Sequence, residues 1–241
     1  MSIKTIKISN IDVEIEKKNI KNLHLGVYPP NGRVRVAAPM KTTDESIRLM
    51  IISKISWIKK QQNKFQSQLR QSQREYVSGE SHYLWGTRYL LNVIYHKGAA
   101  KVIIRNKKFI DLYVRDGTSR DQRERVMTNW YREQIKAVIP DIIQKWEPLM
   151  NVAVDEWRVK AMKTKWGTCN VNAKRIWLNL HLVKKPPQCI EYVVVHEMVH
   201  LKERTHNSRF VSLMDNYYPN WRTIRDELNM FMLDFVESFK E

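Results

Sequence analysis

The feature that most constrains the fold is a change in hydrophobic period near residue 118. Before it, apolar and polar residues alternate in short runs, whereas beyond it apolar residues recur every three to four positions from Met127 to Trp146. Alternation is typical of half-buried strands, and the longer period is typical of amphipathic helices. We therefore expect an α+β protein with a β-rich, basic N-terminal region over residues 1–117 and a compact, mostly helical domain with a short β-hairpin over residues 118–241.

The N-terminal region is expected to contain two strand-rich stretches separated by one helix. Alternating residues at positions 6–16, and again in Leu23–Tyr28 and Arg33–Ala37, are typical of hairpins. Thr43 or Asp44 can then cap a helix that runs to about residue 70. Three or four further strands are expected before residue 117, and no internal repeat is visible in the sequence.

The C-terminal region is expected to contain a long helix, a small hairpin and a more apolar helix. Ser119 can start the long helix, a short strand follows near Trp157–Lys160, and residues 170–174 can close the hairpin. Pro186 and Pro187 then open a helix that includes the run CIEYVVVHEMVHLKE.

Charge is unevenly distributed along the chain. The 42 Lys and Arg residues exceed the 25 Asp and Glu residues by 17, and residues 1–150 hold 28 of the basic residues against 14 of the acidic ones. A surplus of this size is compatible with contact between the N-terminal region and nucleic acid or another polyanion, such as an anionic membrane surface or an acidic protein, and does not choose among them. A solubility surface with no ligand explains the surplus equally well.

The expected compartment is the cytoplasm. No run approaches the roughly eighteen apolar residues of a membrane span, and the N-terminus lacks the apolar core of a signal peptide. The two cysteines, Cys169 and Cys189, are too few for a disulfide framework in a chain of this size. With 43% hydrophobic residues, the chain is expected to fold around its own core and to have no membrane partner.

The chemically informative segment is His196-Glu197-Met198-Val199-His200. In a helix the two histidines lie one turn apart on one face, with about 6 Å between their Cβ atoms, which suits two imidazoles on one metal ion. In a strand they lie about 13 Å apart and cannot share an ion. The β-branched Val193–Val195 favour a strand, whereas Pro186, Pro187 and a length of about seventeen residues favour a helix. The helix is the favoured interpretation.

A catalytic zinc site needs a third protein ligand and one open position for water. His206 lies six residues beyond His200, and the intervening residues can turn the chain back before a following helix. Cys169 and Cys189 are alternative ligands, and Cys169 is the more serious of the two. The short separation favours His206, and the expected cofactor is one Zn²⁺ per chain.

Glu197 is the candidate general base. It follows the first histidine directly, which turns its carboxylate toward the open metal position rather than onto the metal. That arrangement suits a group that takes a proton from the attacking water and returns it to the leaving amine. The sequence does not identify the residue that stabilises the oxyanion, for which the candidates are Tyr192, Tyr217, Tyr218 and His181.

A family resemblance is carried by the segments GRVRVAAP, ISWIKK, YVSGESHYLWGTRYLLNV, KTKWGTCN, RIWLNLHLV and YVVVHEMVHLKERTHNSRF, in that order. Together they resemble the YgjP-like metallopeptidases, which are related to the SprT-like and other small zincin proteases. The last segment matches the family's H-E-x-x-H-x-x-x-x-x-H-x-x-x-F signature, and the resemblance covers nearly the whole chain. It implies a zincin-like metallopeptidase domain over residues 118–241, with zinc on His196, His200 and His206 and with Glu197 as catalytic base. Met198 stands where leucine is usual.

The segment Trp166, Gly167, Thr168 and Cys169 resembles the W-G-S-C element of the same family, with Thr168 in place of serine. In zincins an edge strand beside the metal pairs with extended substrate, and this hairpin is a candidate for that edge. Alternatively, Trp166 and Cys169 pack beneath the metal-binding helix. Both interpretations stay open at the level of the sequence.

Two functions of different classes are compatible with these features. The first is a zinc-dependent metallopeptidase, a hydrolase acting on protein or peptide substrates. The alternative is a basic nucleic-acid-binding protein whose zinc site is structural or non-catalytic. Glu197 favours the first, because a structural site usually has four protein ligands and needs no carboxylate beside an open position. The basic N-terminal region can also steer such an enzyme toward proteins associated with DNA.

Overall fold

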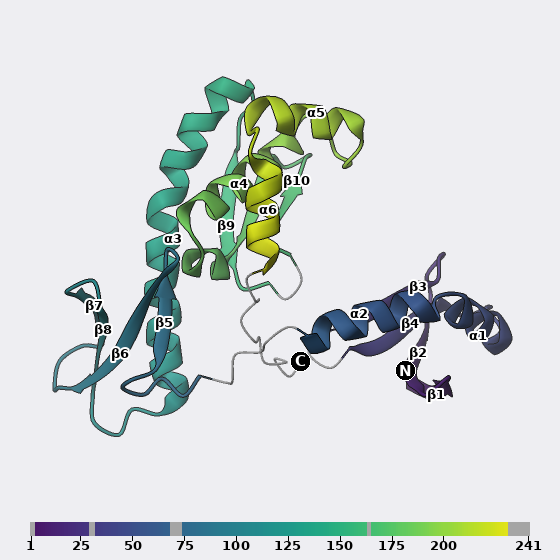
Figure 1. Cartoon of the computed structure of the whole chain (residues 1–241), viewed down its shortest axis with the longest axis horizontal. Coiled ribbons are helices and arrows are strands. Elements are labelled where there is room, and N and C mark those ends of the chain that lie inside the picture. The colour runs from purple at the N-terminus through teal and green to yellow at the C-terminus, as the bar shows by residue number, and fades with distance from the viewer. Residues whose placement is uncertain (1–2, 29–31, 68–73, 163–164, 231–241) are drawn as a thin grey trace. The chain divides into compact units, whose positions relative to one another are not determined.

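The computed structural model describes residues 3–28, 32–67, 74–162 and 165–230, and the chain divides into two compact units, Met1–Gln71 and Ser72–Glu241 (Figure 1). The described residues form three β-sheets and six α-helices, so the predicted α+β class and the β-rich character of the N-terminal region are confirmed. The predicted domain boundary at residue 117 falls inside the second unit, where a strand and the following helix share one core.

The first unit is built on two hairpins laid side by side. Its strands are β1 (Ile3–Ile8), β2 (Ile11–Lys18), β3 (His24–Tyr28) and β4 (Arg33–Pro39), in the order β1-β2-β4-β3. β2 and β4 pair in parallel in the middle, and the outer pairs are antiparallel. Ser9 and Asn10 both have positive φ, as a two-residue hairpin turn requires. The predicted hairpins are therefore confirmed.

Two helices cover this sheet where the sequence predicted one. α1 (Asp44–Ser53) is capped by the side chain of Thr43, and α2 (Ile55–Ser67) follows after a break. At the break, the N–H of Lys54 bonds to the carbonyl of Ile51 three residues back, which tightens the last turn of α1 and ends it. Residues 68–70 of the predicted helix lie outside the described residues. Ile47, Ile51 and Ile58 are fully buried in this unit's core.

The second unit begins with a sheet of the same topology. Its strands are β5 (Ser81–Leu84), β6 (Thr87–Tyr95), β7 (Lys101–Arg105) and β8 (Phe109–Val114), in the order β5-β6-β8-β7. β6 and β8 are the parallel pair in the middle. The two sheets therefore repeat one arrangement of two hairpins, although no repeat is visible in the sequence.

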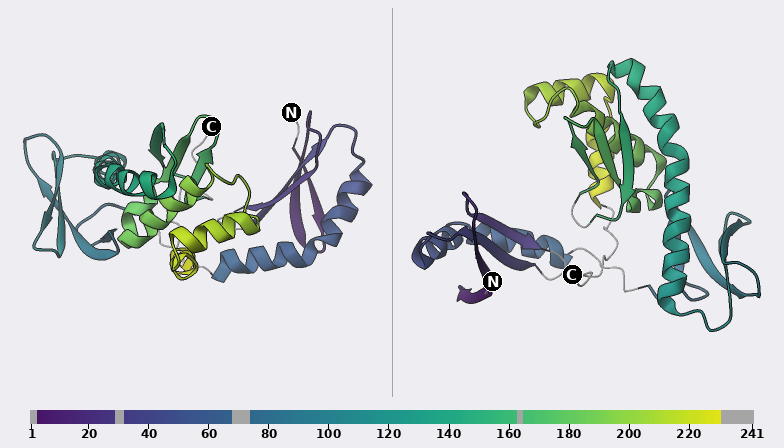
Figure 2. Two further views of the ribbon diagram at one scale, coloured as in Figure 1. Left: turned by 90° about the horizontal axis from the view of Figure 1, so that it is seen from above. Right: turned by 180° about the vertical axis from the view of Figure 1, so that it is seen from behind.

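α3 (Arg120–Met150) links this sheet to the rest of the second unit. Ser119 caps it through a reciprocal pair of hydrogen bonds with Gln122, which confirms the predicted start. One end of α3 contacts β7 and β8, and the helix also contacts α4 (Pro187–Val199), as Figure 2 shows from two sides. No helix of the described residues, α3 included, combines the length and the hydrophobicity needed to cross a bilayer.

The remaining strands form a small sheet in which β10 is an edge. β9 (Glu156–Lys160), β10 (Gly167–Asn170) and β11 (Arg175–Asn179) are arranged in the order β10-β11-β9. The predicted hairpin is β10–β11, and the predicted strand near Trp157 is β9, which pairs in parallel with β11. The buried Asn179 donates to the carbonyls of Met162 and Lys165, at 2.9 and 2.8 Å, and so anchors the chain just before β10.

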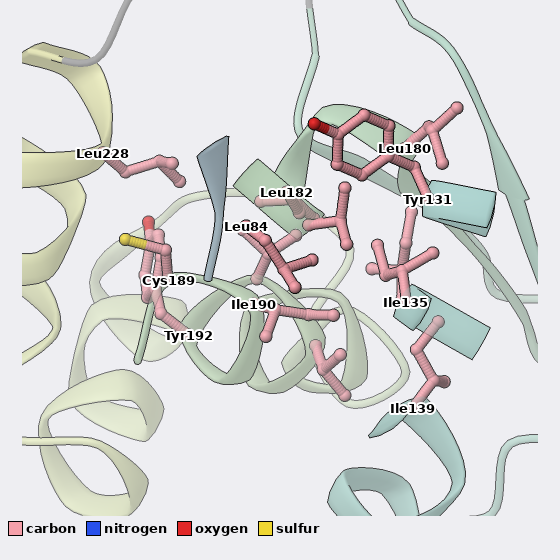
Figure 3. Close-up of a cluster of buried hydrophobic side chains, with 14 of the residues drawn as sticks. Leu84, Tyr131, Ile135, Ile139, Leu180, Leu182, Cys189, Ile190, Tyr192 and Leu228 are labelled. Atoms are coloured by element: carbon pink, nitrogen blue, oxygen red, sulfur yellow. The ribbon is translucent and has the colours of Figure 1, made fainter. Parts of the chain in front are cut away.

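α4 lies at the centre of the second unit. It contacts α3, α5 (Ser208–Tyr217), α6 (Trp221–Met230), β10 and β11, and the short 3-10 helix η1 (Leu180–Lys184) packs beside it. Figure 3 shows Ile190 of α4 among the apolar side chains of neighbouring elements. A helix that is apolar on every side is stable when it is buried on every side. Burial of Val193–Val195 therefore outweighs their preference for a strand.

Candidate metal centre and active-site cleft

The last turn of α4 brings His196 and His200 together. α4 ends at Val199, and His200 keeps a right-handed helical backbone as the C-cap, with its N–H directed at the carbonyl of His196 at 3.4 Å. The centroids of the two imidazole rings are 5.0 Å apart. The helical interpretation of this segment is confirmed, and the strand alternative is wrong.

His206 reaches the same place from the loop between α4 and α5. Its Nε2 lies 3.0 Å from the Nε2 of His196, and its ring centroid lies 4.8 Å from that of His200. One nitrogen from each of the three histidines lies within 4.8 Å of the others. Asn207 holds the end of this loop, because its side chain accepts the N–H of Phe210 and caps α5.

Phe210 provides one apolar surface for all three histidines. Its ring centroid lies 4.9, 4.8 and 4.6 Å from those of His196, His200 and His206, and the residue is 2% exposed. An apolar shell of this kind limits the access of water and the rotation of the ligand rings. Phe210 is the last residue of the H-E-x-x-H-x-x-x-x-x-H-x-x-x-F signature, but the sequence analysis assigned it no role at the metal site.

His196 and His200 have the protonation state that a metal ion needs. Burial lowers the pKa of His196 to about 3 and also lowers the pKa of His200, so both rings are neutral near pH 7, as metal ligands must be. Nδ1 of His200 lies 3.1 Å from the backbone carbonyl of Glu203, to which it can donate while Nε2 stays free to bind a metal.

The spacing of the nitrogens also fits zinc. Two imidazole nitrogens that bind one tetrahedral Zn²⁺ ion at about 2.0–2.1 Å lie roughly 3.3 Å apart. The corresponding atoms of His196 and His206 are 3.0 Å apart. The donor chemistry of the cluster and the spacing of this pair are therefore compatible with one zinc ion.

The alternative thiol ligands lie outside this cluster of described residues. Cys169, on β10, is half-buried, and burial together with the charge of Glu197 raises its pKa to about 11. Cys189 is buried in α4, where burial raises its pKa to about 12. Neither cysteine belongs to the group of side chains that could share one metal ion in the described residues.

Glu197 is buried beside the histidines. It is 5% exposed, and burial raises its pKa to about 8, while the charge of Lys165 acts in the opposite direction. Its side chain lies against the backbone of Gly167, where an added Cβ would be only 2.5 Å from Oε1 of Glu197. The missing side chain of Gly167 therefore makes room for the carboxyl group of Glu197.

These groups line one cleft of about 800 Å³. The predicted edge residues Trp166, Gly167, Thr168 and Cys169 all contribute to its wall. Of the four oxyanion candidates, Tyr192 lines the cleft in the described structure, whereas the hydroxyl of Tyr217 accepts a hydrogen bond from Lys202. The described residues that line the cleft are Lys165–Asn172, Tyr192, Val193, His196, Glu197, His200, Arg204, His206, Arg225, Leu228 and Asn229.

The contact between Gly167 and Glu197 gives a testable prediction. The substitution Gly167→Ala is expected to destabilise the protein by about 1–3 kcal/mol, because the new Cβ overlaps the Glu197 side chain. Thermal unfolding of the wild type and of Gly167→Ala measures this effect.

The matched control for this prediction is the same substitution in a Glu197→Ala background. That background removes the Cγ, Cδ and Oε1 atoms that the new methyl group meets, so Gly167→Ala is expected to cost little stability there. An equal cost in both backgrounds would show that the contact is not the cause.

One family model of known proteins matches most of this chain. The family model described as "YgjP-like, metallopeptidase domain" matches residues 21–231. Among solved structures, the metallopeptidase zymogen of Pyrococcus abyssi abylysin is 18% identical over 40% of this chain and 98% of that chain, with a TM-score of 0.36. The metallopeptidase zymogen of Methanocaldococcus jannaschii jannalysin is 23% identical over 38% of this chain and 93% of that chain, with a TM-score of 0.34. No curated protein matches significantly.

The family match extends over most of both compact units and includes the histidine cluster, Glu197 and β10. It confirms the resemblance that the sequence segments carry. The chain belongs to the YgjP-like metallopeptidase family.

Proposed function

We propose that this chain is a zinc-dependent peptidase in which His196, His200 and His206 hold one Zn²⁺ and Glu197 is the general base. The observation that carries the proposal is the meeting of three histidine nitrogens, within 4.8 Å of one another, in the cleft that contains the buried Glu197 carboxyl group. Three imidazole donors favour zinc over Mg²⁺ or Ca²⁺, which prefer oxygen ligands. A set of three protein ligands also leaves a position open, as catalytic zinc sites do.

The chemistry is divided between the metal and the protein. Bound zinc supplies Lewis acidity, which lowers the pKa of the attacking water and polarises the scissile carbonyl. Glu197 accepts a proton from that water and passes it to the departing amine. Burial suits Glu197 to both steps, because it holds the pKa of the carboxyl group near the working pH.

The exposed side of β10 is the proposed guide for the substrate. In the described residues β10 pairs with β11 on one side only, and all four of its residues line the cleft that contains Glu197. An extended peptide can add to such an edge through main-chain hydrogen bonds, which would place its carbonyl groups beside the metal centre. Trp166 both lines the cleft and packs against the core, so a packing role accompanies any contact with substrate.

Removal of the metal tests the proposed function. The purified chain is expected to hydrolyse a labelled, unfolded protein, to lose this activity on chelation, and to regain it with one equivalent of Zn²⁺ but not with Mg²⁺. Circular dichroism of the chelated protein shows whether the fold survives, which separates loss of the ion from unfolding. Hydrolysis that continues unchanged after complete removal of metal would reject the proposal.

The alternative function has less support. A structural zinc site usually has four protein ligands, whereas the cluster in the described residues has three and lies beside a carboxyl group in an open cleft. Binding of nucleic acid or another polyanion by the basic N-terminal region stays a prediction. Location in the cytoplasm also stays a prediction, and the free thiols of Cys169 and Cys189 are compatible with it.

A further inference from the structure

Positively charged side chains outnumber negatively charged ones in the cleft. Lys165, Arg204 and Arg225 line it, and among the described lining residues Glu197 is the only acid. The three cations come from three separate elements: the segment before β10, the loop after α4, and α6. Positive charge is therefore distributed around the cleft and does not belong to one surface patch.

These cations are available to a ligand. Lys165 and Arg204 are exposed, and neither forms an ion pair with the acids of the described structure. Arg225 contacts Asp226 at 2.9 Å and packs over the ring of Trp221, with its guanidinium carbon 5.1 Å from the ring centroid. The side chains of Arg225 and Asp226 are 42% and 64% exposed, and an exposed pair of this kind is weak and easily exchanged.

We propose that the cleft selects substrates that present carboxylates near the scissile bond, either as Asp and Glu side chains or as a free C-terminal carboxylate. This inference rests on the proposed peptidase function. Pairing with β10 uses main-chain groups and carries little sequence preference, so selection must come from the side chains of the cleft walls. Cations in a concave site focus the field on a ligand, and guanidinium groups bind carboxylates through paired hydrogen bonds.

A single-stranded nucleic acid fits the same cleft less well. Sequence-tolerant binding of single strands uses exposed aromatic faces on which the bases stack. Among the described lining residues outside the histidine cluster, the aromatic side chains are Tyr192, which is 6% exposed, and Trp166, which is half-buried against the core, so neither offers a fully exposed ring face. An edge strand beside a general base instead matches an extended peptide.

The first experiment measures peptide binding by fluorescence anisotropy with the zinc-loaded Glu197→Gln chain, which retains the cleft but does not turn over substrate. Three labelled peptides of equal length are compared: a neutral one with an amidated C-terminus, the same peptide with Glu on both sides of its centre, and the neutral peptide with a free carboxylate. We expect at least one carboxylate peptide to bind about tenfold more tightly than the neutral one, with most of this advantage lost near 0.5 M salt. Tighter binding of the Glu-containing peptide would indicate recognition of acidic side chains, whereas tighter binding of the peptide with the free carboxylate would indicate recognition of the C-terminus.

The second experiment reverses the charges of the cleft. Each of Lys165→Glu, Arg204→Glu and Arg225→Glu is expected to reduce the preference for the carboxylate peptide about two- to fivefold. The control is Arg125→Glu, which makes the same change in net charge at an exposed residue of α3 outside the cleft lining. This control is expected to leave the preference unchanged.

Three results would overturn the proposal: equal binding of the three peptides at low salt, an equal effect of Arg125→Glu, or tighter binding of an oligonucleotide than of any peptide at the cleft cations. Binding is measured without turnover, so these outcomes are separate from failure of the proposed function. If the wild-type chain hydrolyses no peptide but the binding preference is present, the peptidase proposal alone fails.

Discussion

Replacing Glu197 by glutamine is expected to lower kcat by about a thousandfold, because general acid and base catalysis by one positioned group contributes roughly 10²–10⁴ to the rate. Glutamine has nearly the same shape as glutamate but cannot accept the proton from the attacking water. The metal content is expected to stay the same, because Glu197 is not one of the three clustered nitrogen donors. Peptidase kinetics and elemental analysis of the same preparation measure both quantities.

In the metal-free protein, Glu197→Gln is expected to be more stable than the wild type, by a margin that grows as pH rises. Burial raises the pKa of Glu197 to about 8, above its value of about 4.3 in an unfolded chain, so the ionised form is disfavoured in the folded state. Between these two pKa values, the free energy of unfolding of the wild type therefore falls below that of Glu197→Gln by up to about 1.4 kcal/mol per pH unit. Above the higher pKa the difference between the two proteins is constant. Thermal unfolding of both chelated proteins over this range measures the difference.

Glu191→Gln is the matched control for Glu197→Gln. Glu191 lies on the same helix, α4, but its carboxylate binds Lys145 and Trp146 and does not line the cleft. The control is expected to keep kcat within about twofold of the wild type, because surface changes away from a site have small effects. If Glu197→Gln retained more than a tenth of the wild-type kcat, the assignment of Glu197 as general base would be wrong.

Replacing His206 by alanine is expected to remove the zinc ion and with it the peptidase activity. Loss of a hydrogen-bond partner behind a ligand already weakens metal binding by about 10–100-fold, so loss of a ligand is expected to cost at least about 100-fold. Competition with a chromophoric chelator measures the affinity, and elemental analysis measures the content. His206 is exposed, so the substitution itself is expected to change the stability of the metal-free protein little.

Two control variants make this experiment decisive. Cys169→Ala removes the alternative ligand and is expected to keep about one zinc per chain, and His24→Ala removes an exposed histidine of β3 with no expected effect. Zinc is also expected to raise the melting temperature of the wild type and of both controls, but not that of His206→Ala. If zinc were kept without His206 and lost without Cys169, the third ligand would be Cys169 instead.

Local features of this fold could be predicted because they depend on residues a few positions apart. Thr43 and Ser119 were recognisable as caps, since a hydroxyl that accepts an N–H three residues ahead acts within a single turn. The hairpins around Ser9 and between β10 and β11 followed from alternation and turn residues. The break at Lys54 between α1 and α2 was not predicted, because apolar residues recur at helical spacing on both sides of it, at Ile47, Ile51, Ile55 and Ile58.

Features that join distant segments could not be predicted. The sequence indicated both β9 and the β10–β11 hairpin, but not that β9 pairs in parallel with β11 and leaves β10 at the edge. It showed no repeat, yet both four-stranded sheets have the same order, because many apolar sequences can fill the same pattern of hairpins. It also gave no sign that β8 and α3, on either side of residue 117, share one core.

The sequence by itself determined that His196 and His200 are four residues apart, that Glu197 stands between them and that His206 is a candidate third ligand, because these depend on residue identity, local spacing and donor chemistry. Only the tertiary structure decided that Val193–Val195 are helical, since α4 is covered on all sides. It also decided that Gly167 makes room for Glu197, and that three cations from separate elements line one cleft. Those relations depend on long-range packing, for which neighbouring residues carry no signal.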